Sequence, residues 1–252
     1  MWTSKRSAPR AGRGRLGLFL ALVGGRAPAT RVTGTVVEVM DRAAAPTEPL
    51  RVGVLASGAG TNLQALLDDI HGKEIEVVAV AADRPQAGAL ERARALGIET
   101  GVFAIADHDD RSARDAAMAA WMLERGVGLI VLAGYMAILT SAFLSRFEQA
   151  VVNVHPSLLP AFPGIRAIEQ ALDHGVKIFG VTVHFVEDDG GVDTGPVILQ
   201  RAIELPHAAD AGDVHEQLRP IEHALVPEAV RLIARGAVTR DPHNPRRMLI
   251  RE

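Results

Sequence analysis

The sequence predicts an α/β fold with a mostly parallel, twisted sheet and helices on both of its faces. Short runs rich in Val and Ile, bounded by Gly, Pro or Asp, are typical of buried strands. Segments between them carry apolar residues three and four positions apart, as helices do. This alternation favours parallel strands, because each connecting helix covers one face of the sheet.

Up to residue 154, the pattern predicts strands and helices in repeated succession. The expected strands cover 51–56, 74–82, 99–105, 128–134 and 150–154. The expected helices cover 62–70, 87–96 and 110–126.

Beyond residue 176 the pattern changes. Strands are expected at 177–186 and 196–205, on either side of a Gly-rich segment. The apolar spacing at 212–236 predicts a long closing helix. Pro220 is expected to interrupt that helix, because proline has no amide hydrogen for a helical bond.

The N-terminal segment differs from the rest of the chain in charge. It contains no acidic residue up to position 31, and its basic residues are Lys5, Arg6, Arg10, Arg13, Arg15, Arg26 and Arg31. The apolar run at 16–25 and the Ala27-Pro28-Ala29 that follows give it the layout of a secretory signal. We favour a disordered basic extension, or an unused upstream start with Met40 as the true one, because the rest resembles a cytoplasmic metabolic enzyme. The expected divisions are an extension and linker at 1–49, a domain at 50–238 and a C-terminal tail at 239–252.

Composition excludes several classes of protein. With 252 residues, 48% of them hydrophobic, the chain is expected to be a soluble globular protein. The absence of cysteine excludes disulfides and thiolate metal sites and agrees with a cytoplasmic location. A formal charge of -3 gives no general attraction to nucleic acid, and the N-terminal apolar run is too short to cross a membrane. We expect small-molecule partners, a monomer or homodimer, and no metal, because the histidines show no clustered ligand spacing.

The loop after the first strand has features of an anion site. Gly58 and Gly60 permit a tight turn, and the amides of Gly60, Thr61 and Asn62 begin a helix. The third glycine of a dinucleotide motif and the Gly-Lys pair of a Walker loop are both missing, which favours one phosphate over a pyrophosphate. The alternative is a plain strand-to-helix turn capped by Ser57 or Thr61.

The segment VVNVHPSLLP places two polar side chains at the end of a strand. Asn153 and His155 share one face because side chains alternate along a strand, and Pro156 ends the ladder. An amide beside a protonated imidazole can stabilise an oxygen that becomes negative during acyl transfer. The alternative is a core histidine bonded to a neighbouring carbonyl.

Such a site also needs a carboxylate to keep the imidazole charged and to relay protons. The segment EDDGGVDTGPVI offers several acids, of which Asp193 is the strongest candidate, because it lies between a Gly-rich turn and the start of a strand. The stretch 187–189 is expected to form a solvated face.

Five segments together resemble one family of enzymes. They are SGAGTNLQAL, LAGYMAIL, NVHPSLLP, TVHFVEDDGGVDTGPVILQ and IEHALVP, spread over about residues 51–238. In that order they are similar to the phosphoribosylglycinamide formyltransferases, which use 10-formyltetrahydrofolate in purine biosynthesis. NVHPSLLP with the Asp loop alone would indicate only the wider group of formyltetrahydrofolate-dependent enzymes. The resemblance implies a Rossmann-like formyltransferase fold, 10-formyltetrahydrofolate as co-substrate and no metal.

The resemblance also implies roles for individual residues. Asn153, His155 and Asp193 match the family's catalytic trio. The positions that match its ribonucleotide site are Gly60, Thr61 and Asn62 at the phosphate and Arg219 and Glu222 on the closing helix. The positions that match its folate side are Arg111, Met136, Ala137 and Ile138, with Asp189, Gly190, Gly191 and Val192 closing over the pterin through their backbone.

Three positions depart from the family pattern. Arg166 stands where relatives commonly have histidine, Ala137 stands where a basic residue is frequent, and Pro220 lies inside the closing helix. These departures concern substrate affinity more than the type of reaction.

Other functions share parts of this pattern. A formyltetrahydrofolate hydrolase would use the same catalytic trio with water as acceptor, and would usually carry a regulatory domain ahead of it. A methionyl-tRNA formyltransferase would need an RNA-binding domain and a basic surface. A non-catalytic nucleotide-binding module could use the first loop, with Asp83 on a ribose hydroxyl, but would leave the trio unexplained.

Overall fold

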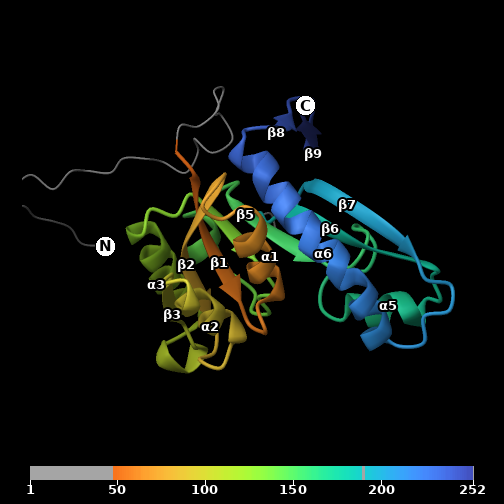
Figure 1. Cartoon of the computed structure of the whole chain (residues 1–252), viewed down its shortest axis with the longest axis horizontal. Coiled ribbons are helices and arrows are strands. Elements are labelled where there is room, and N and C mark those ends of the chain that lie inside the picture. The colour runs from red at the N-terminus through yellow and green to blue at the C-terminus, as the bar shows by residue number, and fades with distance from the viewer. Residues whose placement is uncertain (1–47, 189–190, 252) are drawn as a thin grey trace, which may run out of the picture. The chain divides into compact units, whose positions relative to one another are not determined.

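The computed structural model describes residues 48–188 and 191–251. Several predictions fall outside the described residues: those for the basic extension, the alternative start at Met40, and the roles of Asp189 and Gly190. Of the expected linker, only Glu48 and Pro49 are described. The described part contains a nine-stranded sheet with the order β3-β2-β1-β4-β5-β6-β7-β9-β8 (Figure 1). The strands are β1 Leu50–Ala56, β2 Ile75–Ala82, β3 Glu99–Val102, β4 Leu129–Leu132, β5 Val151–His155, β6 Ile178–Phe185, β7 Val197–Glu204, β8 Val238–Asp241 and β9 Asn244–Ile250.

The first five strands pair in parallel. The later strands β6 and β7 pair antiparallel, and β9 meets β7 in parallel at the pair Val197 and Arg247. The connecting helices are α1 Thr61–Asp69, α2 Gly88–Ala95, α3 Arg111–Glu124, α4 Ser141–Leu144, α5 Ala167–Asp173 and α6 Ala211–Ala234. The predicted fold class, a mostly parallel sheet with helices on both faces, is confirmed.

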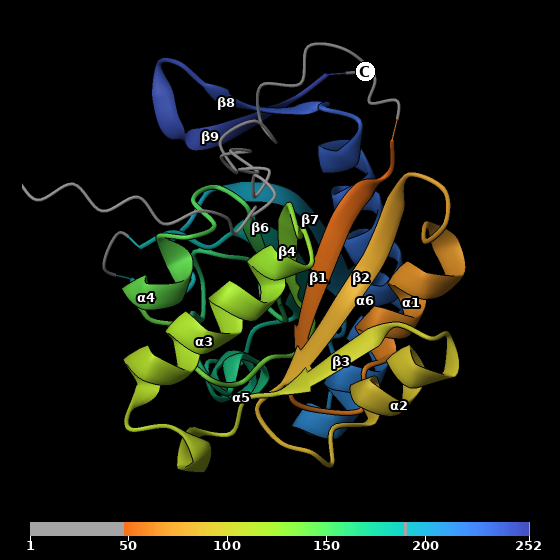
Figure 2. The ribbon, with the colours of Figure 1, turned by 90° about the vertical axis from the view of Figure 1, so that its left-hand side faces the viewer.

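Two apolar clusters form the core, one on each face of the sheet. One contains residues of α1, α2, α5 and α6, and the other contains residues of α3 and α4. Figure 2 shows α3 and α4 on one side of the strands and α1, α2 and α6 on the other. Alternation divides even single strands, since Val54 of β1 belongs to the first cluster and Leu55 to the second. This explains why the parallel strands β1, β2 and β4 are apolar along nearly their whole length.

The closing helix differs from the expectation. α6 runs without a break through Pro220 and Pro227, so the predicted interruption is wrong. An interior proline costs about 3 kcal/mol of helix stability. Residues such as Val214, Leu218 and Leu225 are almost fully buried in the core, and this packing outweighs the cost. None of the helices in the part that the structure describes could span a membrane.

Several elements are shorter than expected or were not predicted. β3 ends at Val102 because Ile105–Asp107 forms a 3-10 turn. The helices α4 and α5 are too short to give a helical period in the sequence. Part of the expected C-terminal tail forms the hairpin of β8 and β9, which extends the sheet beyond β7.

Candidate active site

The site begins at the end of β5. Asn153 lies opposite His184 of β6, and His155 lies opposite Thr182, so the two predicted side chains share a face of the sheet. His155 is only 4% exposed. The strand ends at His155, directly before Pro156, as the sequence predicts.

Asp193 meets both of these side chains. Its Oδ2 lies 3.3 Å from Nδ1 of His155, and its Oδ1 accepts a hydrogen bond of 3.3 Å from the Nδ2 of Asn153. The amide of Gly164 also donates to Oδ2, at 2.8 Å. The structure therefore brings the three predicted residues together from β5 and from the loop between β6 and β7.

The backbone at Asp193 is in an unusual conformation. Its φ of 58° lies in the left-handed region, which a residue with a side chain rarely adopts. Two positions later, a Cβ on Gly195 would lie 1.9 Å from the carbonyl oxygen of Phe185, so only glycine fits there. The tight passage at Gly195 helps to fix the direction of the loop that carries Asp193.

The charge of Asp193 follows from its contacts. Burial alone would raise its pKa, but a hydrogen bond from His184, the Gly164 amide and the positive charges of His155 and His184 together lower the pKa below the usual value for aspartate. The carboxylate is therefore ionised at neutral pH.

His155 contacts hydrogen-bond acceptors on both sides. Its Nε2 lies 2.8 Å from the carbonyl oxygen of Phe162, and its Nδ1 faces the ionised Asp193. A carbonyl oxygen can only accept, so Nε2 carries a hydrogen, and Nδ1 forms an ion pair with Asp193 when the ring is protonated. The carbonyl contact is the one that the core-histidine alternative predicts, whereas the contact with Asp193 is the one that the catalytic interpretation predicts.

His184 is a member of this cluster that the sequence analysis missed. It is 1% exposed, and its Nδ1 lies 2.8 Å from the carbonyl oxygen of Phe185. Nδ1 therefore carries a hydrogen, and Nε2 lies 3.2 Å from Nδ2 of Asn153 and 3.5 Å from Oδ1 of Asp193. The sequence places a polar residue in the middle of a Val-rich strand at this position. That signal identifies a buried histidine but does not show that β6 lies beside β5.

The loop after β1 turns tightly at Gly60. Gly60 precedes α1 with a φ of 74°, and a Cβ there would lie 2.6 Å from the Cα of Ala89. No side chain caps α1, so the alternative of a cap by Ser57 or Thr61 is wrong. The first amides of the helix have no side-chain cap, which suits an anionic ligand.

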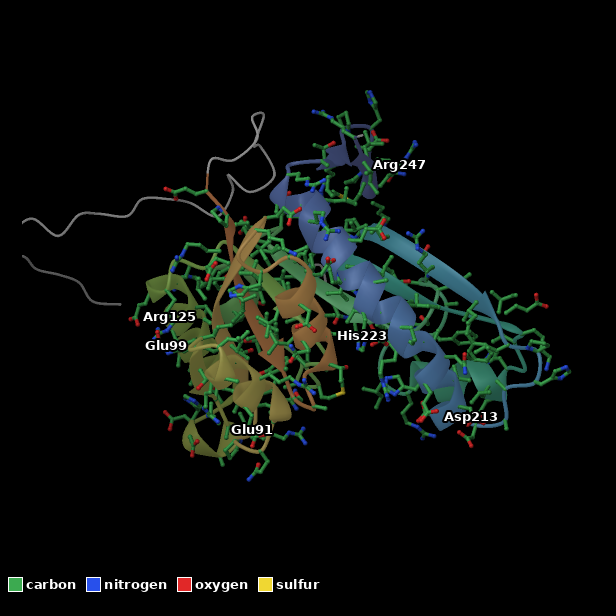
Figure 3. The ribbon with its side chains drawn as sticks, viewed as in Figure 1. Glu91, Glu99, Arg125, Asp213, His223 and Arg247 are labelled. Atoms are coloured by element: carbon green, nitrogen blue, oxygen red, sulfur yellow. The ribbon has the colours of Figure 1, made fainter. Side chains whose placement is uncertain are left out.

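Asn62 and Glu222 come together from distant parts of the chain. The Nδ2 of Asn62 donates to Oε2 of Glu222 at 3.0 Å, and both residues are 7% exposed. Oδ1 of Asn62 and Nε2 of His223 are buried without a hydrogen-bond partner among the described residues. Figure 3 shows His223 on the stretch of α6 that lies beside α1. Arg219 is exposed one turn earlier on α6.

The predicted folate side contains exposed apolar side chains. Met136 is 66% exposed and Ile138 is 59% exposed, on the loop between β4 and α4, with Ala137 half-buried between them. Val192 is 50% exposed, next to the exposed Gly191. Arg111 is the exposed first residue of α3. No hydrogen bond or ion pair links these residues to the trio in the part of the chain that the structure describes.

Comparison with known proteins decides the family. A family model described as formyl transferase matches residues 50–230, more than half of the chain. The chain belongs to the formyl transferase family. The matched part of this formyl transferase spans all of the predicted site, from Gly60 to Glu222.

The relatives of this formyl transferase have consistent names. A phosphoribosylglycinamide formyltransferase of Mycobacterium tuberculosis is 41% identical over 195 residues, 77% of this chain and 89% of that protein. One of Bacillus subtilis is 36% identical over 183 residues, 72% of this chain and 93% of that protein. The crystal structure of glycinamide ribonucleotide transformylase 1 from Symbiobacterium toebii is 42% identical, with a TM-score of 0.77 over 82% of this chain and 96% of that chain.

Proposed function

We propose that this formyl transferase transfers a formyl group from 10-formyltetrahydrofolate to the glycinamide amine of glycinamide ribonucleotide, a step of de novo purine biosynthesis. The observation that carries the proposal is the contact of Asp193 with both Asn153 and His155 at the end of β5. Identity of 41% to a protein named for this reaction supports the choice of substrates.

The ribonucleotide would bind between the first loop and α6. The amides that begin α1 at Gly60, Thr61 and Asn62 would hold its phosphate, because helix N-termini favour anions. Glu222 is fixed by Asn62 and can accept a hydrogen bond from a ribose hydroxyl. Arg219 adds a positive charge on the same face of α6.

The formyl donor would bind on the other side of the trio. It supplies an activated one-carbon acyl group. The exposed side chains of Met136 and Ile138 offer apolar contact to a flat ring, and Arg111 offers a cation to an acidic tail. The further residues proposed on this side are Ala137, Asp189, Gly190, Gly191 and Val192.

The trio would then stabilise charge on the formyl oxygen. The amide of Asn153 and the imidazolium of His155 are the donors for that oxygen. In this structure Nε2 of His155 is hydrogen-bonded to the carbonyl oxygen of Phe162. The formyl oxygen would have to replace that oxygen as the hydrogen-bond acceptor. Asp193 keeps the ring charged and, through water, carries a proton from the attacking amine to the leaving nitrogen. Holding both substrates in place supplies much of the remaining acceleration.

We place this reaction in the cytoplasm, where a chain without cysteine needs no oxidising compartment. The proposed partners are the two small molecules alone, and the proposed assembly is a monomer or a homodimer. Sedimentation of the purified protein would distinguish these two states.

An absorbance assay for the formyl-folate tests the function directly. The assay is run with and without glycinamide ribonucleotide. Consumption that requires the ribonucleotide is the expected result. Consumption without it would identify a hydrolase, and no consumption in either case would identify a binding module.

A further inference from the structure

The loop between β4 and α4, residues 133–140, is fixed at every second residue. The carbonyl of Gly134 accepts from the Ser57 amide at 3.0 Å, and the Met136 amide donates to Oγ of Ser57 at 2.9 Å. The Ile138 carbonyl accepts from Nη2 of Arg114 at 3.3 Å, and the Thr140 amide donates to Oδ2 of Asp115 at 2.6 Å.

This spacing decides which side chains of the loop point outward. Tyr135 is 7% exposed and Leu139 is 8% exposed, so both are anchored in the core. Met136 and Ile138, between them, project into solvent. Burial raises the pKa of Tyr135 to about 12, so its ring stays neutral inside the protein. The loop therefore presents an apolar surface, and its backbone is held by hydrogen bonds to Ser57, Arg114 and Asp115.

Two of the four anchors come from one buried ion pair. Arg114 and Asp115 are adjacent in α3, are 3% and 0% exposed, and are joined by Nη2 to Oδ1 at 2.6 Å and by Nε to Oδ1 at 2.8 Å. A buried ion pair is weak evidence for stability, because removing two charges from water offsets their attraction. The pair instead holds the backbone of one loop, through the Ile138 carbonyl and the Thr140 amide.

The same pair lies on the helix that carries Arg111. Arg111 lies one turn before Arg114 on α3, and Asp110 caps that turn by accepting from the Ala113 amide at 2.8 Å. Arg111, Met136 and Ile138 thus belong to one unit, with Arg114 and Asp115 at its centre.

We propose that Arg114 and Asp115 are positioning residues that hold this unit in the shape that receives the formyl-folate. The proposal rests on the proposed function, because it assigns the unit to the formyl donor rather than to the ribonucleotide. It assigns the pair no contact with either substrate. A preformed surface binds its ligand without first having to order a loop, so loss of the pair weakens binding of the formyl donor selectively.

Two variants test the proposal. Asp115→Asn removes the charge at nearly constant size, but it leaves Arg114 buried without a counter-ion and lowers stability. The double variant Arg114→Met with Asp115→Leu replaces both charges by apolar groups of similar volume, which keeps the core filled. Glu228→Gln is the control, because it breaks the exposed pair of Glu228 with Arg201 on the far part of α6.

Steady-state kinetics on the full chain gives the decisive measurement. In the folded double variant, KM for 10-formyltetrahydrofolate should rise about tenfold, with KM for the ribonucleotide unchanged. The Thr140 amide, which loses its acceptor on Asp115, should also exchange hydrogen faster. Asp115→Asn should show the same selectivity, and Glu228→Gln should match the wild type.

An unchanged KM for the formyl donor, or an equal rise in both KM values, would overturn the proposal. Failure of the proposed function is distinguishable from this, because the wild type itself would then transfer no formyl group. In that case the exchange rate of the Thr140 amide still reports whether the pair holds the loop.

Discussion

Asp193 is approached by four donors. Asn153, His155, His184 and the Gly164 amide all approach its two carboxylate oxygens. Asp193, Phe162 and Arg166 all have positive φ, and strained backbone of this kind is common at functional sites. The four donors come from three segments, which are β5, β6 and the turn that contains Gly164. The carboxylate of Asp193 links these segments.

Substitution of the trio tests this role. Asp193→Asn removes the charge that faces His155, and His155→Ala removes the donor itself. Either change should lower kcat by about two to four orders of magnitude, with both KM values largely kept. Single-turnover kinetics would separate the chemical step from binding. Normal turnover in either variant would show that the assigned roles are wrong.

The lowered pKa of Asp193 also predicts how stability depends on pH. Ionised Asp193 stabilises the native state above its unfolded pKa of about 3.9, and this stability is lost as pH falls through the lower native pKa. The difference in free energy of unfolding between wild type and Asp193→Asn should therefore shrink as pH falls below about 4. Urea titrations at a series of acidic pH values would measure it. A difference that stays constant with pH would contradict the ionised state.

Local sequence was enough to predict part of the site. Asn153 and His155 were predictable because strand alternation and Pro156 are both local signals. His184 and the Phe162 carbonyl were not, because their contacts depend on an antiparallel neighbour and on a left-handed turn at Phe162. The approach of Asp193 to Asn153 and His155 likewise depends on the tertiary fold.

The helix α6 shows how packing overrides local preference. It continues through two prolines because its buried face fills the core between α1 and the sheet. Local preference alone predicted a break, since the sequence does not reveal how much surface the helix buries. The hairpin of β8 and β9 was missed for a similar reason, because β9 is mostly exposed and is defined by its partners.

Replacement of an exposed proline in α6 should stabilise the protein. Pro220 is exposed, so Pro220→Ala loses little packing and restores a helical hydrogen bond. The gain of about 3 kcal/mol is reduced by the extra entropy of the unfolded chain, leaving about 2 kcal/mol in the free energy of unfolding. Denaturant unfolding would measure the change, with Pro227→Ala as the control, because Pro227 is buried and its loss opens a cavity. Destabilisation by Pro220→Ala would show that the ring has a packing role.

At the scale of the whole molecule, the site lies where the strand order reverses. β1 leads outward to β2 and β3, and β4 then begins the other half of the sheet beside β1. Ligands in such sheets bind at this switch point, at the carboxyl ends of the strands. The loops after β1 and β4 meet there through Ser57. The alternation of strands and helices in the sequence predicts a site at the carboxyl ends of the strands. It does not predict the order of the strands in the sheet.

The expected basic extension and linker precede the described core and the predicted site. The core clusters run from Leu50 to Val238, and the predicted site runs from Gly60 to Glu222. Since residues 1–49 are expected to be an extension and linker outside the domain, a chain that begins at Glu48 should keep both the kcat and the melting temperature of the full chain. Parallel assays and thermal unfolding would check this. A large loss of either would assign a role to residues 1–47.

The fate of the formyl carbon tests the central claim most directly. The full chain is incubated with 10-formyltetrahydrofolate labelled at that carbon and with glycinamide ribonucleotide, and the products are followed by NMR. We predict that the label appears as an amide on the glycinamide nitrogen, and that Asp193→Asn slows its appearance by about two to four orders of magnitude. Label that appears only as free formate, or that stays on the folate, would contradict formyl transfer by this site.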